Sequence, residues 1–158
     1  MKKPSRRSFL VQLPSGIAAL AFALRSPRAQ AQSAMTIPHT SLIEPAEAAA
    51  MLRKPNAGRW KILQVGFRSM YEQRHIRGAV YAGPASQPEG LTNLRSAVSG
   101  LTHESPILLY CGCCPWSHCP NIAPAWNALQ GMGFRSVRVI EIANNFGDDW
   151  VAKGYPVA

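Results

Sequence analysis

Acidic residues are scarce in this sequence of 158 residues, where 8 Asp and Glu stand against 17 Lys and Arg. A formal net charge of +9 would ordinarily favour a nucleic-acid or anionic-membrane partner. However, residues 1–31 contain six of the basic residues and no acidic one, which leaves 11 against 8, or +3, in the rest of the chain. Most of the excess belongs to one terminal segment, so nucleic-acid binding loses its main support.

Several common site patterns are also missing. The sequence has no glycine-rich phosphate loop, no paired-carboxylate pattern and no Ser-His-Asp arrangement, which removes the usual signs of nucleotide, glycosidase and serine-hydrolase chemistry. It also has no internal repeat and no low-complexity segment. With 47% apolar and 16% charged residues it is neither disordered nor collagenous, and its length fits one domain with a tail.

Residues 1–31 have the three parts of an export signal. Met1–Arg7 is basic, residues 13–24 are apolar but too few to span a membrane stably, and Ala29-Gln30-Ala31 is a small-residue cleavage site. The run Ser5-Arg6-Arg7-Ser8-Phe9-Leu10 resembles the twin-arginine motif of proteins that are exported folded. We expect cleavage after Ala31, a periplasmic or otherwise exported mature protein, and no stable membrane insertion. An uncleaved anchor and an ordinary signal for unfolded export are the alternatives.

The chain after a polar linker at residues 32–40 has the pattern of one α/β domain, residues 41–158. Apolar strands that alternate with helices predict a central parallel sheet with right-handed crossovers and helices on both faces. Strands are expected at residues 60–65, 75–81, 106–110 and 136–140, helices at 44–52, 69–74, 91–98 and 121–130, and a loop at 84–90. The strand at 106–110 is the clearest, because it is apolar throughout and begins with a proline.

All four cysteines lie within nine residues, from Cys111 to Cys119. Cys111 directly follows the clearest strand, and a helix is expected to begin near Asn121. Ligands of parallel sheets bind beyond the carboxyl ends of the strands, and the first amides of a helix favour an anion. We therefore expect the Cys111 thiol to ionise more easily than a free thiol and to act as a nucleophile.

At three places the sequence resembles the rhodanese family of sulfurtransferases. The first place runs from Ile62-Leu-Gln-Val-Gly66 through Tyr71 to His75-Ile-Arg-Gly-Ala79, and the second is Ile107-Leu-Leu-Tyr-Cys111. The third leads from Gly133-Phe134 through residues 137–140 to Trp150-Val-Ala-Lys-Gly-Tyr-Pro-Val157. The resemblance covers nearly all of residues 41–158, and it implies a single rhodanese-like domain there.

The resemblance also implies a reaction. Rhodaneses move a sulfane sulfur from a donor such as thiosulfate to a thiol or cyanide acceptor, through a cysteine persulfide and without a required cofactor. Cys111 matches the position of the nucleophile, and Gly112 to Trp116 approximately match the loop whose backbone N–H groups hold the persulfide anion. Small sulfur donors and acceptors are then the expected partners, together with a redox or sulfur-relay protein. The expected substrate-binding loop comprises Gly112, Cys113, Cys114, Trp116, Ser117 and His118.

Two kinds of departure from the family pattern stand out. Gln64 and Gly66 replace an Asp and an Arg, and Arg74 replaces a Gly, at positions that are mainly architectural. The cysteine loop is longer than in typical members and has no Lys or Arg between Cys111 and Asn121, so thiosulfate binding would depend on backbone dipoles and His118. The missing arginine argues against a Cys-x5-Arg phosphatase or arsenate reductase, because those enzymes hold an oxyanion with it.

The additional cysteines leave three interpretations open. Cys113 or Cys114 pairs with Cys119 in a disulfide that shapes the loop; or a neighbouring thiol resolves the Cys111 persulfide or disulfide. In the third, the loop holds copper or zinc, although its spacing matches no common zinc motif. Sulfurtransfer is thus the expected function, against a non-catalytic copper-, zinc- or sulfur-binding protein or a thiol–disulfide exchange protein. The candidate metal ligands are Cys111, Cys113, Cys114, His118 and Cys119.

The remaining candidates have structural roles as their first interpretation. His75 is expected to be a turn histidine, Asn144-Asn145 a turn, and Phe146 and Trp150 core residues. Trp116 either forms a wall of the pocket or packs beneath the loop. His118 is either a loop acid–base or ligand residue, or an exposed residue at the helix start. His39 and His103 carry no functional signal.

Overall fold

The structure is a computed structural model that describes residues 37–158. The predicted signal peptide and most of the predicted linker lie outside these residues, so both remain predictions. Within residues 37–158, no helix has the length and apolar character that crossing a bilayer requires.

Five parallel strands form the central sheet, in the order β1-β5-β4-β2-β3. The predicted parallel α/β architecture is confirmed, and all four predicted strands are present with shorter bounds. The fifth strand, β1, was not predicted, because its two residues are too few to show a periodicity. The strands are β1 Leu42–Ile43, β2 Lys61–Gln64, β3 Val80–Tyr81, β4 Ile107–Tyr110 and β5 Val137–Ile140.

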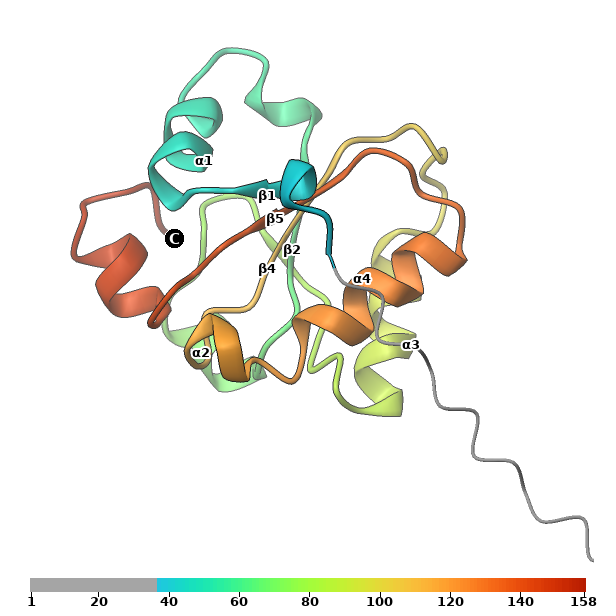
Figure 1. Cartoon of the computed structure of the whole chain (residues 1–158). Coiled ribbons are helices and arrows are strands. Elements are labelled where there is room, and N and C mark those ends of the chain that lie inside the picture. Colours follow the sequence, from blue (N-terminus) through green and yellow to red (C-terminus); the bar gives the residue numbers. More distant parts are fainter. Residues whose placement is uncertain (1–36) are drawn as a thin grey trace, which may run out of the picture. The chain divides into compact units, whose positions relative to one another are not determined.

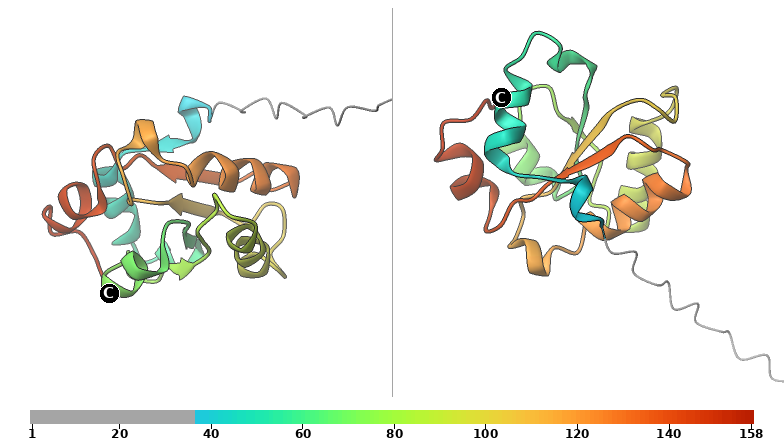
Figure 2. Two further views of the ribbon diagram at one scale, coloured as in Figure 1. Left: turned by 90° about the horizontal axis from the view of Figure 1, so that it is seen from below. Right: turned by 45° about the horizontal axis from the view of Figure 1, so that its top comes forward.

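Helices cover both faces of the sheet. Figure 1 shows α1 and the C-terminal helix on one side of the strands and α3 and α4 on the other, and the views in Figure 2 keep α3 beside α4. The α-helices are α1 Pro45–Leu52, α2 Arg68–Gln73, α3 Pro88–Ala97 and α4 Ile122–Gly131. Short 3-10 helices span His39–Ser41, Ala57–Arg59 and Trp116–His118, and a π-helix spans Gly147–Val151.

The beginning of α3 corrects the prediction. Residues 84–90 were expected to be a loop, yet the helix begins at Pro88. A proline at the first helical position lacks only an N–H that would have no partner there, and Glu89 in the first turn suits the positive end of the helix dipole. Both signals favour a helix start, and they outweigh the weak apolar periodicity of the segment.

Strand β4 separates two apolar cores because successive side chains of a strand point to opposite faces. Ile107, Leu109 and Cys111 belong to the core under α3 and α4. Leu108 and Tyr110 belong to the core under α1 and the π-helix, where Phe146 and Trp150 are also buried, as predicted. Cys111 is therefore both the first residue after the central strand and the last core residue on the α3–α4 face.

Candidate active site at the end of the central strand

The turn after Cys111 is built around Gly112. This glycine has a φ of +76°, a conformation that residues with a Cβ rarely adopt, and a Cβ there would lie 2.8 Å from Cβ of Phe146. The backbone N–H of Phe146 donates to the Gly112 carbonyl at 3.1 Å, which fixes the turn from the other side. The chain therefore reverses within one residue, and the Cys113 side chain comes back to Cys111.

The turn brings sulfur atoms into contact. Sγ of Cys111 lies 3.0 Å from Sγ of Cys113, and Cys113 lies 3.3 Å from Sγ of Cys114. Cys111, Cys113 and Cys119 have all their sulfur atoms within 4.8 Å of one another. All four cysteines are free thiols, so the disulfide from Cys113 or Cys114 to Cys119 stays a prediction. The shorter of these two sulfur–sulfur contacts joins Cys111 and Cys113, a pair that was not singled out from the sequence.

Asn121 holds this pair of sulfurs from the side of α4. The residue is fully buried, and its Nδ2 lies 3.6 Å from the sulfur of Cys111 and 3.5 Å from that of Cys113. Its Oδ1 accepts a hydrogen bond from the Ser86 backbone N–H at 2.9 Å, which fixes the orientation of the amide. An Asn just before an apolar helix suggests a helix cap, yet this side chain does not cap α4, so the sequence offered no signal for its actual role.

The charge in the cluster rests on a different cysteine from the one expected. Contacts with the thiols of Cys111 and Cys119 hold the pKa of Cys113 well below its usual range, with smaller contributions from Cys114 and Asn121. Contacts with Cys113 and Cys119, together with burial, raise the pKa of Cys111. The prediction of an easily ionised Cys111 is therefore wrong. Where several thiols touch, they share the negative charge, and the central sulfur, which accepts hydrogen bonds from its neighbours, is the favoured position for it.

The backbone amides at the start of α4 also point elsewhere. Those of Asn121 and Ile122 face Cys119 rather than Cys111, whereas the backbone N–H of Cys113 faces Cys111. The N–H of Trp116 is occupied by the carbonyl of Ala143 at 3.1 Å. The expected cradle around Cys111 therefore consists of one loop amide and the Asn121 side chain, without the helix terminus.

Both departures from the family's strand lie beside Cys111. A Cβ at Gly66 would lie 2.8 Å from Nε2 of Gln64 and 3.1 Å from the sulfur of Cys111, so a larger residue would crowd the reacting atom. Gln64 is buried, and its Nε2 faces the Cys111 carbonyl at 3.5 Å while its Oε1 has no partner. These two residues shape the floor of the site, a role that the sequence argument did not assign to them.

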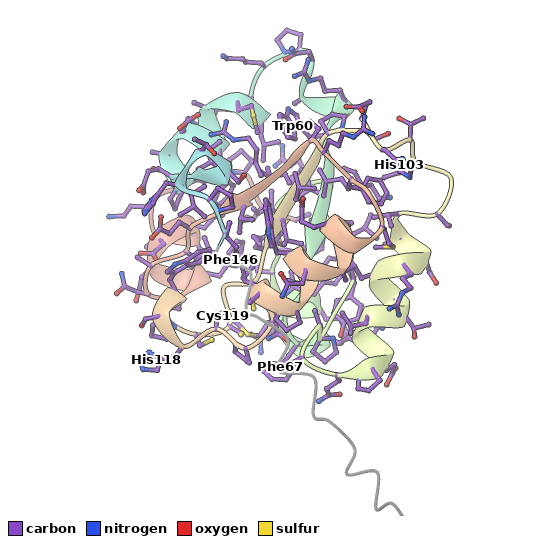
Figure 3. The ribbon with its side chains drawn as sticks, turned by 45° about the vertical axis from the view of Figure 1, so that its right-hand side comes forward. Trp60, Phe67, His103, His118, Cys119 and Phe146 are labelled. Atoms are coloured by element: carbon purple, nitrogen blue, oxygen red, sulfur yellow. The ribbon has the colours of Figure 1, made fainter. Side chains whose placement is uncertain are left out.

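The predicted loop residues fall into two groups. Trp116 is half-buried and lines the small hollow next to Cys111 together with Cys114 and Ile142, so it has both the wall and the packing role. Ser117 and His118 are exposed and bond to each other at 2.8 Å, and Figure 3 shows His118 at the rim, pointing away from the domain. The sulfur cluster and these two residues are therefore not brought together.

Positive charge does not reach the sulfurs from the loop, which has no Lys or Arg before Asn121. Arg68, at the same end of the sheet, stacks over the ring of Tyr81 at 4.2 Å and pairs with Glu72 at 3.8 Å. His75 stacks on Tyr71 and bonds its carbonyl at 2.8 Å, in agreement with the structural role predicted for it. The site offers thiols and amides for chemistry, and Cys111 itself is only 3% exposed.

Comparisons with known proteins agree with this architecture. A family model described as a rhodanese-like domain matches residues 44–142. Among solved structures, the chain is similar to the rhodanese-like domain of an Anabaena protein, with 23% identity and a TM-score of 0.54 over 75% of this chain and 78% of that one. A Bacillus halodurans protein is similar at 19% identity, with a TM-score of 0.57 over 75% and 77% of the two chains.

A third similar structure is a Rhodopseudomonas palustris protein of unknown function, described as a possible tyrosine phosphatase. It shares 21% identity with a TM-score of 0.52, over 75% of this chain and 84% of that one. These likenesses show the fold. Among curated proteins, none matches the sequence significantly.

Proposed function

This chain belongs to the rhodanese-like domain family, and from that premise we propose that it is a sulfurtransferase whose Cys111 carries a sulfane sulfur as a persulfide. One observation carries the proposal: the Cys111 thiol stands at the carboxyl end of the central strand in contact with a second sulfur that can take its proton. The sulfur donor is thiosulfate or a polysulfide, and the acceptor is a thiol or cyanide.

The first step uses the short distance between the two sulfurs. Cys111 and Cys113 share one proton across 3.0 Å, and as the donor approaches the proton moves to Cys113, whose thiol then stabilises the thiolate on Cys111. The Cys111 sulfur attacks the outer sulfur of thiosulfate. A bond forms between these two sulfurs, and the sulfur–sulfur bond of the donor breaks, with its electron pair leaving on sulfite. The backbone N–H of Cys113 and the Nδ2 of Asn121 then face the persulfide.

Access to Cys111 requires a movement of the loop. Cys111 is buried, and the hollow beside it is too small to hold a water molecule. The donor therefore enters when the loop, with its 3-10 helix Trp116–His118, moves away from the sulfur. Since no Lys or Arg lines the entrance within the loop, donor recognition depends on amide dipoles and on sulfur contacts rather than on an ion pair.

The experiment is a mass measurement on the reduced full chain after incubation with thiosulfate or inorganic polysulfide. The expected product is one additional sulfur, mapped to Cys111 in the Cys113→Ser variant, which should load more slowly without its proton acceptor but leaves the adduct no thiol at that position to react with. The Cys111→Ser variant is the control and should take up no sulfur there. If neither donor adds sulfur to any variant that retains Cys111, the sulfurtransferase proposal is wrong.

We also propose that the protein works outside the cytoplasmic membrane, after export through a twin-arginine-type signal at residues 1–31. The paired Arg6-Arg7 before Phe9-Leu10 supports this location. Cell fractionation of the full chain and of an Arg6→Lys, Arg7→Lys variant tests it. Export of the unchanged chain that is abolished in the variant is expected, and retention of both in the cytoplasm would exclude it.

A soft metal ion is a second candidate ligand for the same site. Three sulfur atoms, those of Cys111, Cys113 and Cys119, lie within 4.8 Å of one another, and three thiolates suit Cu(I) better than zinc, which takes four ligands. The exposed His118 lies at the rim and does not join them. Elemental analysis of protein isolated without chelators tests this candidate: stoichiometric copper that is lost in Cys113→Ser supports it, and metal-free protein excludes it.

A further inference from the structure

We infer that Cys111 and Cys113 form a redox pair that releases the bound sulfur as hydrosulfide, with Cys113 displacing it from Cys111 and a Cys111–Cys113 disulfide as the product. This inference rests on the proposed function, because it begins from the persulfide on Cys111. It adds an activity to that function: the protein reduces sulfane sulfur at the expense of its own two thiols, before any external acceptor takes part.

The geometry that carries the inference lies in the turn between Cys111 and Cys113. Gly112 turns the chain at a φ of +76°. Phe146 fixes this turn, because its N–H donates to the Gly112 carbonyl and its side chain leaves no space for a Cβ on Gly112. The result is a sulfur–sulfur distance of 3.0 Å between residues that are two positions apart. A disulfide bond has a length of about 2 Å, so the two sulfurs need to approach by about 1 Å.

Asn121 keeps both sulfurs in this arrangement. The Ser86 N–H fixes the orientation of its amide. Its Nδ2 is nearly equidistant from the two sulfurs, at 3.6 Å from that of Cys111 and 3.5 Å from that of Cys113. A donor between two sulfurs stabilises negative charge on either one. Charge can therefore move from one cysteine to the other during the exchange without movement of the α4 terminus.

The step balances in atoms and electrons. After transfer, Cys111 carries the persulfide anion and Cys113 holds the proton that it received. The Cys113 sulfur attacks Sγ of Cys111, the bond from Sγ to the outer sulfur breaks, and its electron pair leaves on the outer sulfur together with the Cys113 proton, as hydrosulfide. The two cysteine sulfurs are oxidised by two electrons, and the sulfane sulfur is reduced by two.

Exposure determines how the pair is restored. Cys111 is 3% exposed, whereas Cys113 is half-buried, so an exogenous dithiol reaches the Cys113 sulfur of the disulfide first. Attack there gives a mixed disulfide on Cys113 and frees Cys111 as a thiolate, and the second thiol of the dithiol completes the reduction. Each cycle therefore consumes one dithiol and one sulfane sulfur, and it releases one hydrosulfide.

Cys114 provides a matched control. Its sulfur contacts Cys113 at 3.3 Å, its thiol faces the His118 carbonyl at 3.7 Å, and it is absent from the group of three converging sulfurs. A Cys114→Ser variant therefore removes a neighbouring thiol, and with it a smaller contribution to the lowered pKa of Cys113, but it keeps both sulfurs of the Cys111–Cys113 pair.

The test uses the reduced full chain, kept free of oxygen, with inorganic thiosulfate and no added thiol. The unchanged chain and Cys114→Ser should release about one hydrosulfide per chain and form a Cys111–Cys113 disulfide, which peptide mapping identifies. Cys113→Ser lacks the proton acceptor and should take up sulfur more slowly; once loaded, it should retain the persulfide on Cys111 and release hydrosulfide at least about tenfold more slowly than the unchanged chain. Circular dichroism of each variant verifies the fold.

The outcomes separate this inference from the proposed function. A stable persulfide on Cys111 of the unchanged chain, with neither hydrosulfide nor disulfide, overturns the inference and leaves the sulfurtransferase proposal standing. A disulfide that joins Cys111 to Cys119 instead overturns the assignment to Cys113. If no sulfur is taken up by the unchanged chain or by Cys113→Ser, both proposals are wrong.

Discussion

The two ends of the central sheet differ in charge and in space. At the carboxyl end, four thiols meet in a loop without Lys or Arg, beside a hollow too small for a water molecule. At the amino end, a groove of about 460 Å³ is lined by residues that include Arg53, Trp60 and Arg77. Figure 3 shows Trp60 and Cys119 at opposite ends of the domain.

Reactive groups and open space lie apart in this molecule. The groove has cations that would attract an anionic sulfur donor, yet it contains no thiol. The sulfur cluster has nucleophiles but no such cation in its loop. A site of this kind selects ligands that react with sulfur and gains little from charge attraction, so its reactivity should depend weakly on ionic strength.

Removal of the nucleophile at the carboxyl end should have the largest effect. Cys111→Ser should lower sulfur transfer from thiosulfate by at least about a thousandfold, because a hydroxyl does not form the persulfide. The fold should remain, since the replacement has nearly the same size. Transfer to cyanide, followed as thiocyanate, and urea unfolding measure the two effects. Transfer that survives in this variant would move the nucleophile to Cys113.

Each end of the sheet has a glycine with a positive φ, and substitution of the two should have unequal effects on stability. Gly112→Ala should lower the free energy of unfolding by about 3 kcal/mol, because backbone strain is joined by a clash with Phe146. Gly78 lines the amino-end groove at a φ of +81° and has nothing within 4 Å of its Cβ position, so Gly78→Ala should lower it by only about 1 kcal/mol. Equal values in urea unfolding would contradict the steric role of Phe146.

Substitution of Asn121 should change the pH dependence of the cluster. Asn121→Asp keeps an oxygen for the Ser86 N–H but turns an oxygen, instead of an N–H, toward Cys111 and Cys113. The contacts from Cys111, Cys119, Cys114 and Asn121 lower the pKa of Cys113, so the unchanged chain keeps its thiolate as the pH falls below the usual thiol range.

In Asn121→Asp the thiolate should already be lost at a higher pH, and the alkylation rate should fall about tenfold for each pH unit below this raised pKa. Thiolate absorbance and iodoacetamide reaction rates against pH measure both. Asn93→Asp is the control. Asn93 lies outside the cysteine loop, is half-buried, and donates from Nδ2 to the Gly83 carbonyl at 2.9 Å. Identical profiles for the unchanged chain and Asn121→Asp would exclude a role for the amide.

The smallest effect is expected at the amino end. An Arg53→Gln, Arg77→Gln variant removes two cations from the groove and should change the rate of sulfur transfer from thiosulfate by less than about twofold, because exposed charges at that distance are screened. Transfer rates at low and physiological ionic strength test this. A larger decrease that added salt removes would show that the groove steers the donor, and that the two ends are coupled.

The sequence was sufficient for the architecture because each main element has a local cause. β4 is apolar throughout and flanked by a proline, α1 begins with a proline, and α4 ends at Gly131. β1 was missed because two residues show no periodicity. The π-helix Gly147–Val151 was missed as well, since its shape depends on the burial of Trp150 against the second core.

The site was predicted only in part because its geometry comes from residues far apart in the chain. The position of Cys111 followed from the strand before it. The approach of Cys113 depends on Phe146, and the position of the Asn121 amide depends on Ser86, neither of which local patterns indicate. The ionisation of Cys111 was predicted wrongly for the same reason, since the helix amides that were assigned to it face Cys119.

Cys111 is also part of the core beneath α3 and α4, so a modification of its sulfur changes the packing of that core. A persulfide adds one heavy atom beside Ile122, Ile140 and Ile142, in a hollow too small to hold a water molecule. In packing terms, each turnover is a small-to-large core substitution that is made and then reversed. Protein with and without the persulfide on Cys111 should therefore differ in melting temperature and in resistance to proteolysis. The melting temperature would then indicate whether the chain carries a sulfane sulfur.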